Sequence, residues 1–326
     1  MGNSYGITGS KIFITGGAGF IATRMASLLA DDNEIVLYDN LHNNAYQHTA
    51  LSDHPNVKLV VGDTLDPDKL ASAMDPDVNY VIHCASIAGV DTVRQYPMKT
   101  LKVNILGAFN VLHETSKLKS LKRFMDFSTS EVFGQQAYNV DEFSIKPEVT
   151  IGEARWTYAI SKLASEFITH AYHVQQAMPT VIVRPFNIYG PNQVGVGAIH
   201  HFVVRAVKGE DLVVHDDGSQ IRSWCYVDDF VHGILLSLAN DVAIGKSYNI
   251  GNPRSTITVY NLAQLIRTLA GSTSIVRFEA RNYQDVALRI PNINSARTDL
   301  GFEPAVELEE GLTRTIDWYR SKLASE

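Results

Sequence analysis

The chain has 326 residues, more than one average domain and fewer than two large ones. Hydrophobic residues make up 45 % and charged residues 19 %, which indicates a soluble chain with a sizeable core. The 28 Lys and Arg against 35 Asp and Glu give a net charge of −7, which argues against nucleic-acid binding as the main function.

Short β-branched runs alternate with helical patterns through the first half of the chain. The runs lie at 11–15, 34–38, 57–61, 78–83, 123–127 and 180–184, and the helical patterns at 21–30, 67–74, 101–118 and 158–174. Apolar runs without polar alternation, separated by helices, predict parallel strands that are buried on both faces. The expected fold class is therefore α/β, with a Rossmann-type doubly wound parallel sheet.

The pattern of predicted elements changes after Phe186. Segments become shorter, and turn signals occur at Gly190-Pro191, at Asp217-Gly218 and at 251–253. We predict a dinucleotide-binding domain over residues 1–185 and a smaller mixed α/β substrate-binding lobe over 186–326. Segments of the two are expected to interleave.

A glycine-rich turn follows the first predicted strand and opens a helix. It reads Gly16-Gly17-Ala18-Gly19-Phe20-Ile21, with Ala22 in place of a third glycine. Glycines permit a tight turn and a close backbone approach, and the amino end of the helix can receive a pyrophosphate. A plain structural turn remains the alternative.

Two aspartates follow the next strands. Asp39 stands 20 residues after Gly19, where a carboxylate can bind both hydroxyls of an adenosine ribose. The same carboxylate would repel a 2′-phosphate, and no Arg or Lys lies between Tyr38 and Val57, so NAD is favoured over NADP. Asp63 is placed to meet the adenine, or equally to act as a helix cap or turn residue.

Tyr158 and Lys162 are four residues apart, so a helix places both on one face. A phenol with a pKa of about 10 is a poor base at neutral pH, and a neighbouring ammonium favours the phenolate. Upstream, the polar stretch Ser128–Gly134 ends a buried strand, where Thr129 can hold the oxygen that Tyr158 deprotonates. Chance spacing in a helix, and a polar turn after a strand, are the alternatives.

Together these segments resemble the extended short-chain dehydrogenase/reductases, and more narrowly their nucleotide-sugar epimerases, dehydratases and decarboxylases. Two departures stand out: Ala22 replaces a glycine, and Asp216 stands where relatives usually have glycine, so the loop there is expected to differ. The resemblance is carried by residues 15–21, 83–86, 128–134, 158–162, 184–191, 217–222, 226–229 and 248–252.

The resemblance implies roles for matching positions. Tyr158 would remove the proton of the sugar C4 hydroxyl while hydride passes to NAD, Lys162 would bind the nicotinamide ribose, and Thr129 would bind the reacting oxygen. Substrate contacts are expected from Asn187, Arg222 and Arg289. The expected cofactor contacts are Gly16, Gly19, Phe20, Ile21, Asp39, Asn40, Asp63, Thr64, Ala85, Ser86, Asn104, Tyr158 and Lys162.

The reaction depends on the residues after Thr129. The 4,6-dehydratases carry Asp-Glu there, whereas this chain has Ser130-Glu131, so dehydration would lack its proton donor. Segments 154–158 and 283–291 resemble UDP-glucuronate decarboxylases and UDP-apiose/UDP-xylose synthases, in which a Ser or Cys, a Glu and a late Arg handle the carboxylate and the C5 proton. Those roles map onto Ser130, Glu131 and Arg289. A 4-epimerase is the main alternative, and a non-catalytic NAD-binding regulator the remaining one.

Compartment and partners follow from what the chain lacks. It has two cysteines, Cys84 and Cys225, no apolar run of about 20 residues and no leader-like amino terminus. We expect a cytoplasmic protein that binds no metal, nucleic acid or membrane. On the resemblance, the helices at 100–118 and 156–176 are expected to pair in a homodimer.

Overall fold

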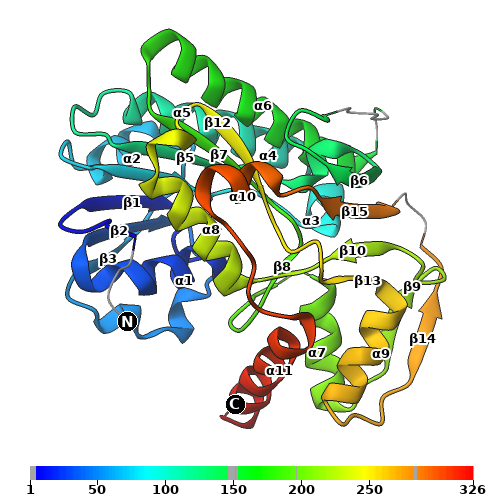
Figure 1. Cartoon of the computed structure of the whole chain (residues 1–326). Helices are drawn as coiled ribbons and strands as arrows, with labels where there is room; N and C mark the ends of the chain where they lie inside the picture. The colour runs from blue at the N-terminus through cyan, green and yellow to red at the C-terminus, as the bar shows by residue number, and fades with distance from the viewer. Residues whose placement is uncertain (1–4, 146–150, 152, 196, 282–284, 326) are drawn as a thin grey trace.

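A seven-stranded parallel sheet forms the centre of the computed structural model, which describes residues 5–145, 151, 153–195, 197–281 and 285–325 (Figure 1). The strand order is β12-β7-β5-β4-β1-β2-β3, and every neighbouring pair is parallel. This confirms the predicted doubly wound α/β fold. The strands are β1 (Lys11–Thr15), β2 (Glu34–Asp39), β3 (Val57–Val61), β4 (Tyr80–His83), β5 (Arg123–Phe127), β7 (Thr180–Pro185) and β12 (Lys246–Ile250).

Helices cover both faces of this sheet, as the unbroken apolar strands require. All residues of β4 and β5 are buried. On one face lie α1 (Phe20–Leu29) and α8 (Val227–Ala239), which contact each other. The opposite face carries α2 (Pro67–Ala73), α5 (Gly107–Thr115) and α6 (Ala154–Gln176).

The helix expected over 101–118 is instead built from three segments. It begins with α4 (Pro97–Leu101), where proline occupies the first turn, as its fixed φ allows. A π-helical turn, η4 (Lys102–Leu106), then leads into α5. That wider turn contains the buried Asn104, whose side chain binds backbone outside the helix.

A second sheet is mixed and has the order β13-β10-β15-β6. Only the pair β10–β13 is antiparallel. The segment β6 comes from the first half of the chain, whereas β12 of the large sheet comes from the second half, so the two sheets exchange strands. The strands are β6 (Gln136–Val140), β10 (Ile221–Ser223), β13 (Thr256–Thr258) and β15 (Leu288–Pro291).

The smaller lobe is completed by two short parallel pairs and three helices. The three helices contact one another and lie below the second sheet in Figure 1. A fourth helix, α10 (Asn294–Leu300), packs on α8 and β12 of the large part. The pairs are β8 (Ile188–Tyr189) with β11 (Cys225–Tyr226) and β9 (Leu212–His215) with β14 (Val276–Glu279), and the helices are α7 (Ala198–Lys208), α9 (Val259–Leu269) and α11 (Leu308–Ser325).

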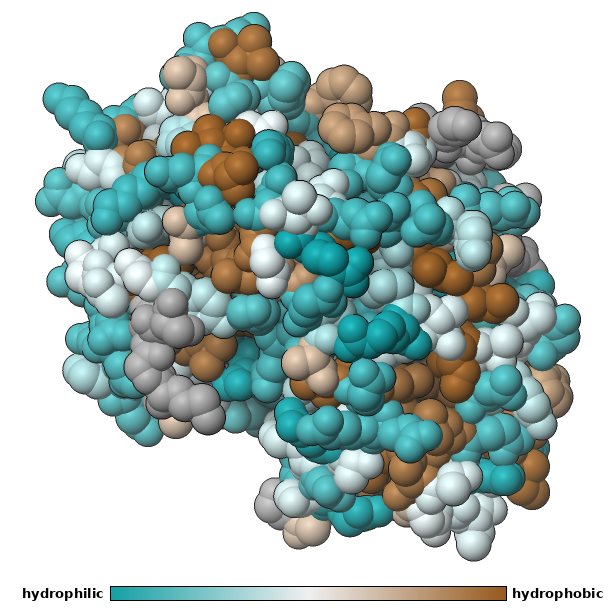
Figure 2. Space-filling view, viewed as in Figure 1, coloured by the Kyte–Doolittle hydropathy of each residue, from teal (hydrophilic) through white to brown (hydrophobic). Residues whose placement is uncertain are grey.

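Figure 2 shows the surface in the same view, with hydrophobic side chains scattered between larger hydrophilic areas on this face. Within the described residues, no helix is long and apolar enough to cross a membrane.

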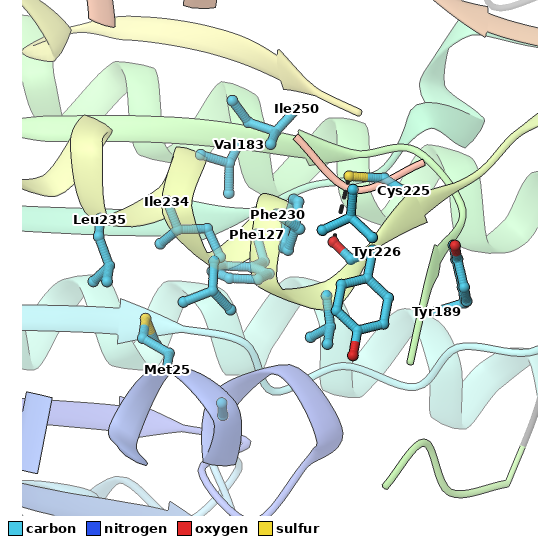
Figure 3. Close-up of a cluster of buried hydrophobic side chains, with 14 of the residues drawn as sticks. Met25, Phe127, Val183, Tyr189, Cys225, Tyr226, Phe230, Ile234, Leu235 and Ile250 are labelled. Carbon is cyan, nitrogen blue, oxygen red and sulfur yellow. Dashed lines mark hydrogen bonds between the residues drawn. The ribbon is translucent and has the colours of Figure 1, made fainter. Parts of the chain in front are cut away.

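One hydrophobic core joins the large sheet to the smaller lobe (Figure 3). Phe230 of α8 packs edge-on against Phe127 of β5, with ring centroids 5.8 Å apart. Val183 and Ile250 from the neighbouring strands and Cys225 from the lobe are buried in the same cluster. Burying one such side chain contributes roughly 1.5–3 kcal/mol, so this core holds the lobe against the sheet.

Candidate active site

The glycine turn after β1, residues 16–19, packs closely against neighbouring backbone, so residues with a side chain could not replace its first two glycines; we call this turn the cradle. Gly16 has φ +67, and a Cβ there would lie 2.7 Å from the backbone nitrogen of Ala85. A Cβ on Gly17 would lie 2.7 Å from Cα of Leu37. Gly19 caps α1 without a side chain, so the first amides of the helix, beginning with Phe20 and Ile21, are open to an anion.

Asp39 lies at the carboxyl end of β2 beside this turn. Its carboxylate accepts hydrogen bonds from the backbone amides of Ala18 (3.1 Å) and Leu41 (2.7 Å). Burial raises the pKa of Asp39, and these amides act against that shift. The next residue, Asn40, uses its side-chain oxygen to accept from the amide of His42. The carboxylate is therefore held rigidly beside the glycine turn.

Asp63 and Thr64 follow β3 on the neighbouring side. Asp63 accepts from the amide of Leu65 at 2.9 Å and so forms a turn, whereas the cap of α2 is Asp66. The helix-cap interpretation of Asp63 is therefore wrong, and the turn interpretation describes it. Thr64 is buried, and its hydroxyl would be 2.6 Å from a Cβ on Gly107.

The loop after β4 forms the other wall of the cradle. The amide of Ala85 donates to Oγ1 of Thr15, and the hydroxyl of Ser86 hydrogen-bonds with the Tyr158 phenol. Asn104 is fully buried and holds both backbone polar groups of Ile87, at 2.8 and 3.1 Å.

Asn104 also donates to Oγ of Ser161 at 2.9 Å, and that hydroxyl donates to the carbonyl of Tyr158. These contacts of Asn104 connect the loop after β4 to α6.

Tyr158 and Lys162 lie on one face of α6, as their spacing predicts. Tyr158 lines a pocket together with Gly89, Val90, Val93, Glu131 and Arg155. Burial raises the pKa of the Tyr158 phenol to about 12, while hydrogen bonds with Thr129 and Ser86 lower it. Lys162 is 1 % exposed, and its Nζ lies 3.7 Å from Oδ1 of the buried Asp126.

The residues after β5 form a short helical turn, η5 (Ser130–Phe133), that faces this pocket. Thr129 is its N-cap and accepts from the amide of Glu131 at 3.2 Å. The side chain of Glu131 is 24 % exposed, and Arg155 lies 3.2 Å from its Oε1. Arg289 of β15 lies 3.3 Å from its Oε2. Glu131 is thus positioned between two guanidinium groups.

Arg289 is 1 % exposed and binds backbone as well as Glu131. It donates to the carbonyl oxygens of Ser130 and Gly134, the latter at 2.9 Å. Burial raises the pKa of Glu131, but Arg289 and Arg155 outweigh it and hold the pKa below its ordinary value of 4.5. Glu131 is therefore a carboxylate at neutral pH.

A second carboxylate, Asp285, neutralises the rest of the arginines. Its Oδ1 lies 2.7 Å from Arg155 and 3.3 Å from Arg222. Burial raises the pKa of Asp285, but these arginines outweigh it and lower the pKa. Arg155 thus bridges the two carboxylates. We call this set the arginine cluster; it consists of Arg155, Arg222, Arg281, Arg289, Glu131 and Asp285.

Asn187 is placed by its backbone next to the smaller lobe. Its φ is +47, and its side chain donates to the carbonyl of Ser223 at 2.8 Å. Asn187 therefore ties the end of β7 to β10, the strand that carries Arg222. Asp216, where a glycine was expected in relatives, also has a positive φ of +54.

Two members of the site were not singled out from the sequence. Arg155 lies three residues before Tyr158, a spacing that puts both on one helix face, so this signal was available. Asp285 was not singled out because two of its arginine partners, Arg155 of α6 and Arg222 of β10, lie far away in the chain.

Comparisons with known proteins place the chain among nucleotide-sugar enzymes of one family. Residues 12–251 match the model of the NAD dependent epimerase/dehydratase family. A UDP-glucuronic acid decarboxylase 1 of Xenopus tropicalis is 31 % identical over 317 residues, 96 % of this chain and 73 % of that protein. A UDP-N-acetyl-alpha-D-glucosaminuronate decarboxylase of Bacillus cytotoxicus is 31 % identical over 322 residues, 95 % of this chain and 98 % of that protein.

A solved structure is similar throughout. The UDP-glucuronic acid 4-epimerase of Bacillus cereus, in complex with UDP-glucuronic acid and NAD, has a TM-score of 0.86 and 26 % identity. The match covers 96 % of this chain and 99 % of that one.

Proposed function

Because the chain belongs to the NAD dependent epimerase/dehydratase family, we propose that this NAD-dependent nucleotide-sugar enzyme decarboxylates a UDP-hexuronate such as UDP-glucuronate. The observation that carries the proposal is the ionised Glu131, positioned between Arg155 and Arg289 beside Tyr158. Two relatives are named decarboxylases of UDP-hexuronates, which supports the same substrate class.

The residues of the cradle fit NAD. The positive φ of Gly16 and its close approach to Ala85 leave backbone at the place where a pyrophosphate is received, and the open amino end of α1 adds its dipole. Asp39 provides the carboxylate for the adenosine ribose. NAD, when bound, supplies the hydride acceptor and a positively charged ring.

The first chemical step belongs to Tyr158. Its phenolate takes the proton of the sugar C4 hydroxyl, and the hydroxyl of Thr129 holds the same oxygen. The ammonium of Lys162, one helical turn away, favours the phenolate over the phenol. Burial is the main reason that the pKa of this phenol is raised to about 12, so positive charge beside it is required for base catalysis near neutral pH.

The second step concerns the C6 carboxylate. Once C4 is a ketone, the C5–C6 bond breaks, CO2 leaves and its electron pair moves toward the C4 oxygen. Arg155 and Arg289 orient the anionic group, while the negative charge of Glu131 disfavours a second carboxylate nearby and promotes its loss. A proton then reaches C5, for which the hydroxyl of Ser130 and the carboxylate of Glu131 are the polar groups at hand.

The nucleotide diphosphate is assigned to the other half of the arginine cluster. Arg222 lies on β10, next to Asn187, and its guanidinium can bind two phosphate oxygens at once. Asp285 accepts a hydrogen bond from Arg222 at 3.3 Å and so orients this guanidinium. In this assignment residues 1–185 bind NAD and 186–326 supply most of the sugar-nucleotide contacts.

A 4-epimerase is the second candidate. The observation that favours it is the likeness to the Bacillus cereus 4-epimerase, because the same Tyr158 and Lys162 would serve that reaction. Epimerisation requires the ketone to turn over before hydride returns. The Glu131–Arg155–Arg289 arrangement limits that rotation, which is why we rank it second.

We also propose a homodimer that forms through α4, α5 and α6. Helix α6 contacts both α4 and α5, and the three helices expose several large apolar side chains. A second copy of the same surface would bury them by forming a four-helix bundle. The side chains are Met98, Phe109, Phe167 and Val174, exposed by 82 %, 49 %, 68 % and 66 %.

The reaction is tested by following UDP-glucuronate with the purified protein by proton NMR, first without and then with added NAD. UDP-xylose or its 4-keto precursor would support decarboxylation, whereas UDP-galacturonate would show that epimerisation is the reaction. Tyr158→Phe is the control, because it removes only the phenol oxygen and should abolish turnover without unfolding the protein. An unchanged spectrum with either UDP-glucuronate or UDP-galacturonate would refute the proposed substrate class.

A further inference from the structure

Asp126 is a buried charge that the mechanism above does not use. It lies on β5 with no exposed surface, beneath α6. Its Oδ1 is 3.7 Å from Nζ of Lys162, and its Oδ2 accepts from the hydroxyls of Ser165 (2.7 Å) and Thr169 (3.4 Å). Residues 162, 165 and 169 follow one stripe of the helix, so successive turns of α6 meet this one carboxylate.

The neighbouring strands provide no positive charge for Asp126. Thr15, His83 and Asp126 are register partners across β1, β4 and β5, so their side chains share one face of the sheet. The His83 ring hydrogen-bonds with Thr15 at 2.7 Å, and burial lowers the pKa of His83 to about 3, so this ring is neutral. Within the part of the chain that the structure describes, Asp126 forms its ion pair with Lys162.

We propose that Asp126 is a positioning residue that anchors the Lys162 ammonium and offsets part of its charge, and so sets the pH at which Tyr158 becomes a base. The idea rests on the proposed roles of Tyr158 and Lys162. Asp126 keeps the ammonium in place within the protein, and its own negative charge works against the phenolate.

The surroundings of Tyr158 allow this effect to be isolated. The side of the pocket formed by α3 (Val90–Gln95) presents Val90 and Val93, which carry no charge. The titratable and charged groups around the Tyr158–Lys162 pair are His83 and Cys84 from the β4 side, Asp126 from β5, Glu131 from η5, and Arg155 from α6 itself.

The test is Asp126→Asn, which removes the charge and keeps the shape. Removing a nearby negative charge should lower the pKa of Tyr158 by roughly 0.5–1 unit. The pKa is measured by carbon NMR on NAD-bound protein labelled at tyrosine Cζ, with the Tyr158 signal identified by its loss in Tyr158→Phe. Thr169→Val is the matched control, because it removes a hydroxyl contact to Asp126 but no charge.

The expected result is a Tyr158 titration at lower pH in Asp126→Asn and an unchanged titration in Thr169→Val. A titration at or above the wild-type pH, or an equal shift in both variants, would overturn the proposal. If Asp126→Asn does not fold, the Tyr158 titration is measured in Asp126→Ser, which also lacks the charge, and the same outcomes apply. The titration needs no sugar substrate, so failure of the decarboxylase proposal would leave this result interpretable.

Discussion

Replacing Arg289 with methionine removes a side-chain donor that links β15 to the turn after β5. The guanidinium of Arg289 is 1 % exposed and donates to the carbonyls of Ser130 and Gly134 and to the carboxylate of Glu131. Methionine is a flexible apolar side chain that can occupy much of the same space, but it donates no hydrogen bond. The variant therefore leaves two backbone oxygens and one carboxylate without this partner.

The magnitude follows from these contacts. A buried acceptor that loses its donor costs about 1–3 kcal/mol, and breaking a buried ion pair by removing one partner costs about 3–5 kcal/mol. Glu131 retains Arg155 at 3.2 Å and its side chain is 24 % exposed, so its share is small. We expect the free energy of unfolding to fall by about 3–5 kcal/mol, mostly from the two carbonyls.

The assay is urea unfolding followed by circular dichroism, with NAD held at one fixed excess for all variants. Arg297→Met is the matched control, because Arg297 pairs with Glu303 at the surface, where the two side chains are 45 % and 51 % exposed. Exposed pairs contribute about 0–1 kcal/mol. A loss in Arg289→Met no larger than in Arg297→Met would refute the reasoning that these carbonyls depend on Arg289.

Three further predictions follow from the structure. Gly16→Ala should weaken NAD binding at least about tenfold in calorimetry, because the new Cβ would collide with the backbone of Ala85. Gly9→Ala is the control: Gly9 also has a positive φ of +59, but open space surrounds it, so NAD binding should not change. Folding depresses the pKa of Glu131, so its ionised carboxylate stabilises the folded protein above pH 4.5, and this contribution is lost as the pH falls. Urea midpoints should therefore drop more steeply below pH 4.5 in wild type than in Glu131→Gln. Phe167→Glu should convert a dimer into a monomer by light scattering, and a wild-type monomer would contradict that interface.

Local spacing predicted much of the molecule. The mainly apolar, β-branched runs predict β1, β2, β3, β5 and β7 to within a residue at each end, because such runs between helices are typical of the strands of a parallel sheet. The glycine spacing predicts the turn before α1, and the interval of four residues places Tyr158 and Lys162 on one face of α6. The helix over 101–118 was predicted as continuous, but its apolar pattern does not reveal the π-turn around Asn104.

Tertiary structure decided the charge environment of the site. The parallel pairing of β10 with β15 places Arg222 opposite Arg289, and the two like charges coexist because Glu131 and Asp285 lie between the arginines. The sequence by itself determined the elements and the pairs within one helix, since those depend on spacing of a few residues. The pairing of β15 with β6 brings together residues more than a hundred positions apart, such as Glu131 and Arg289, and no local pattern encodes that contact.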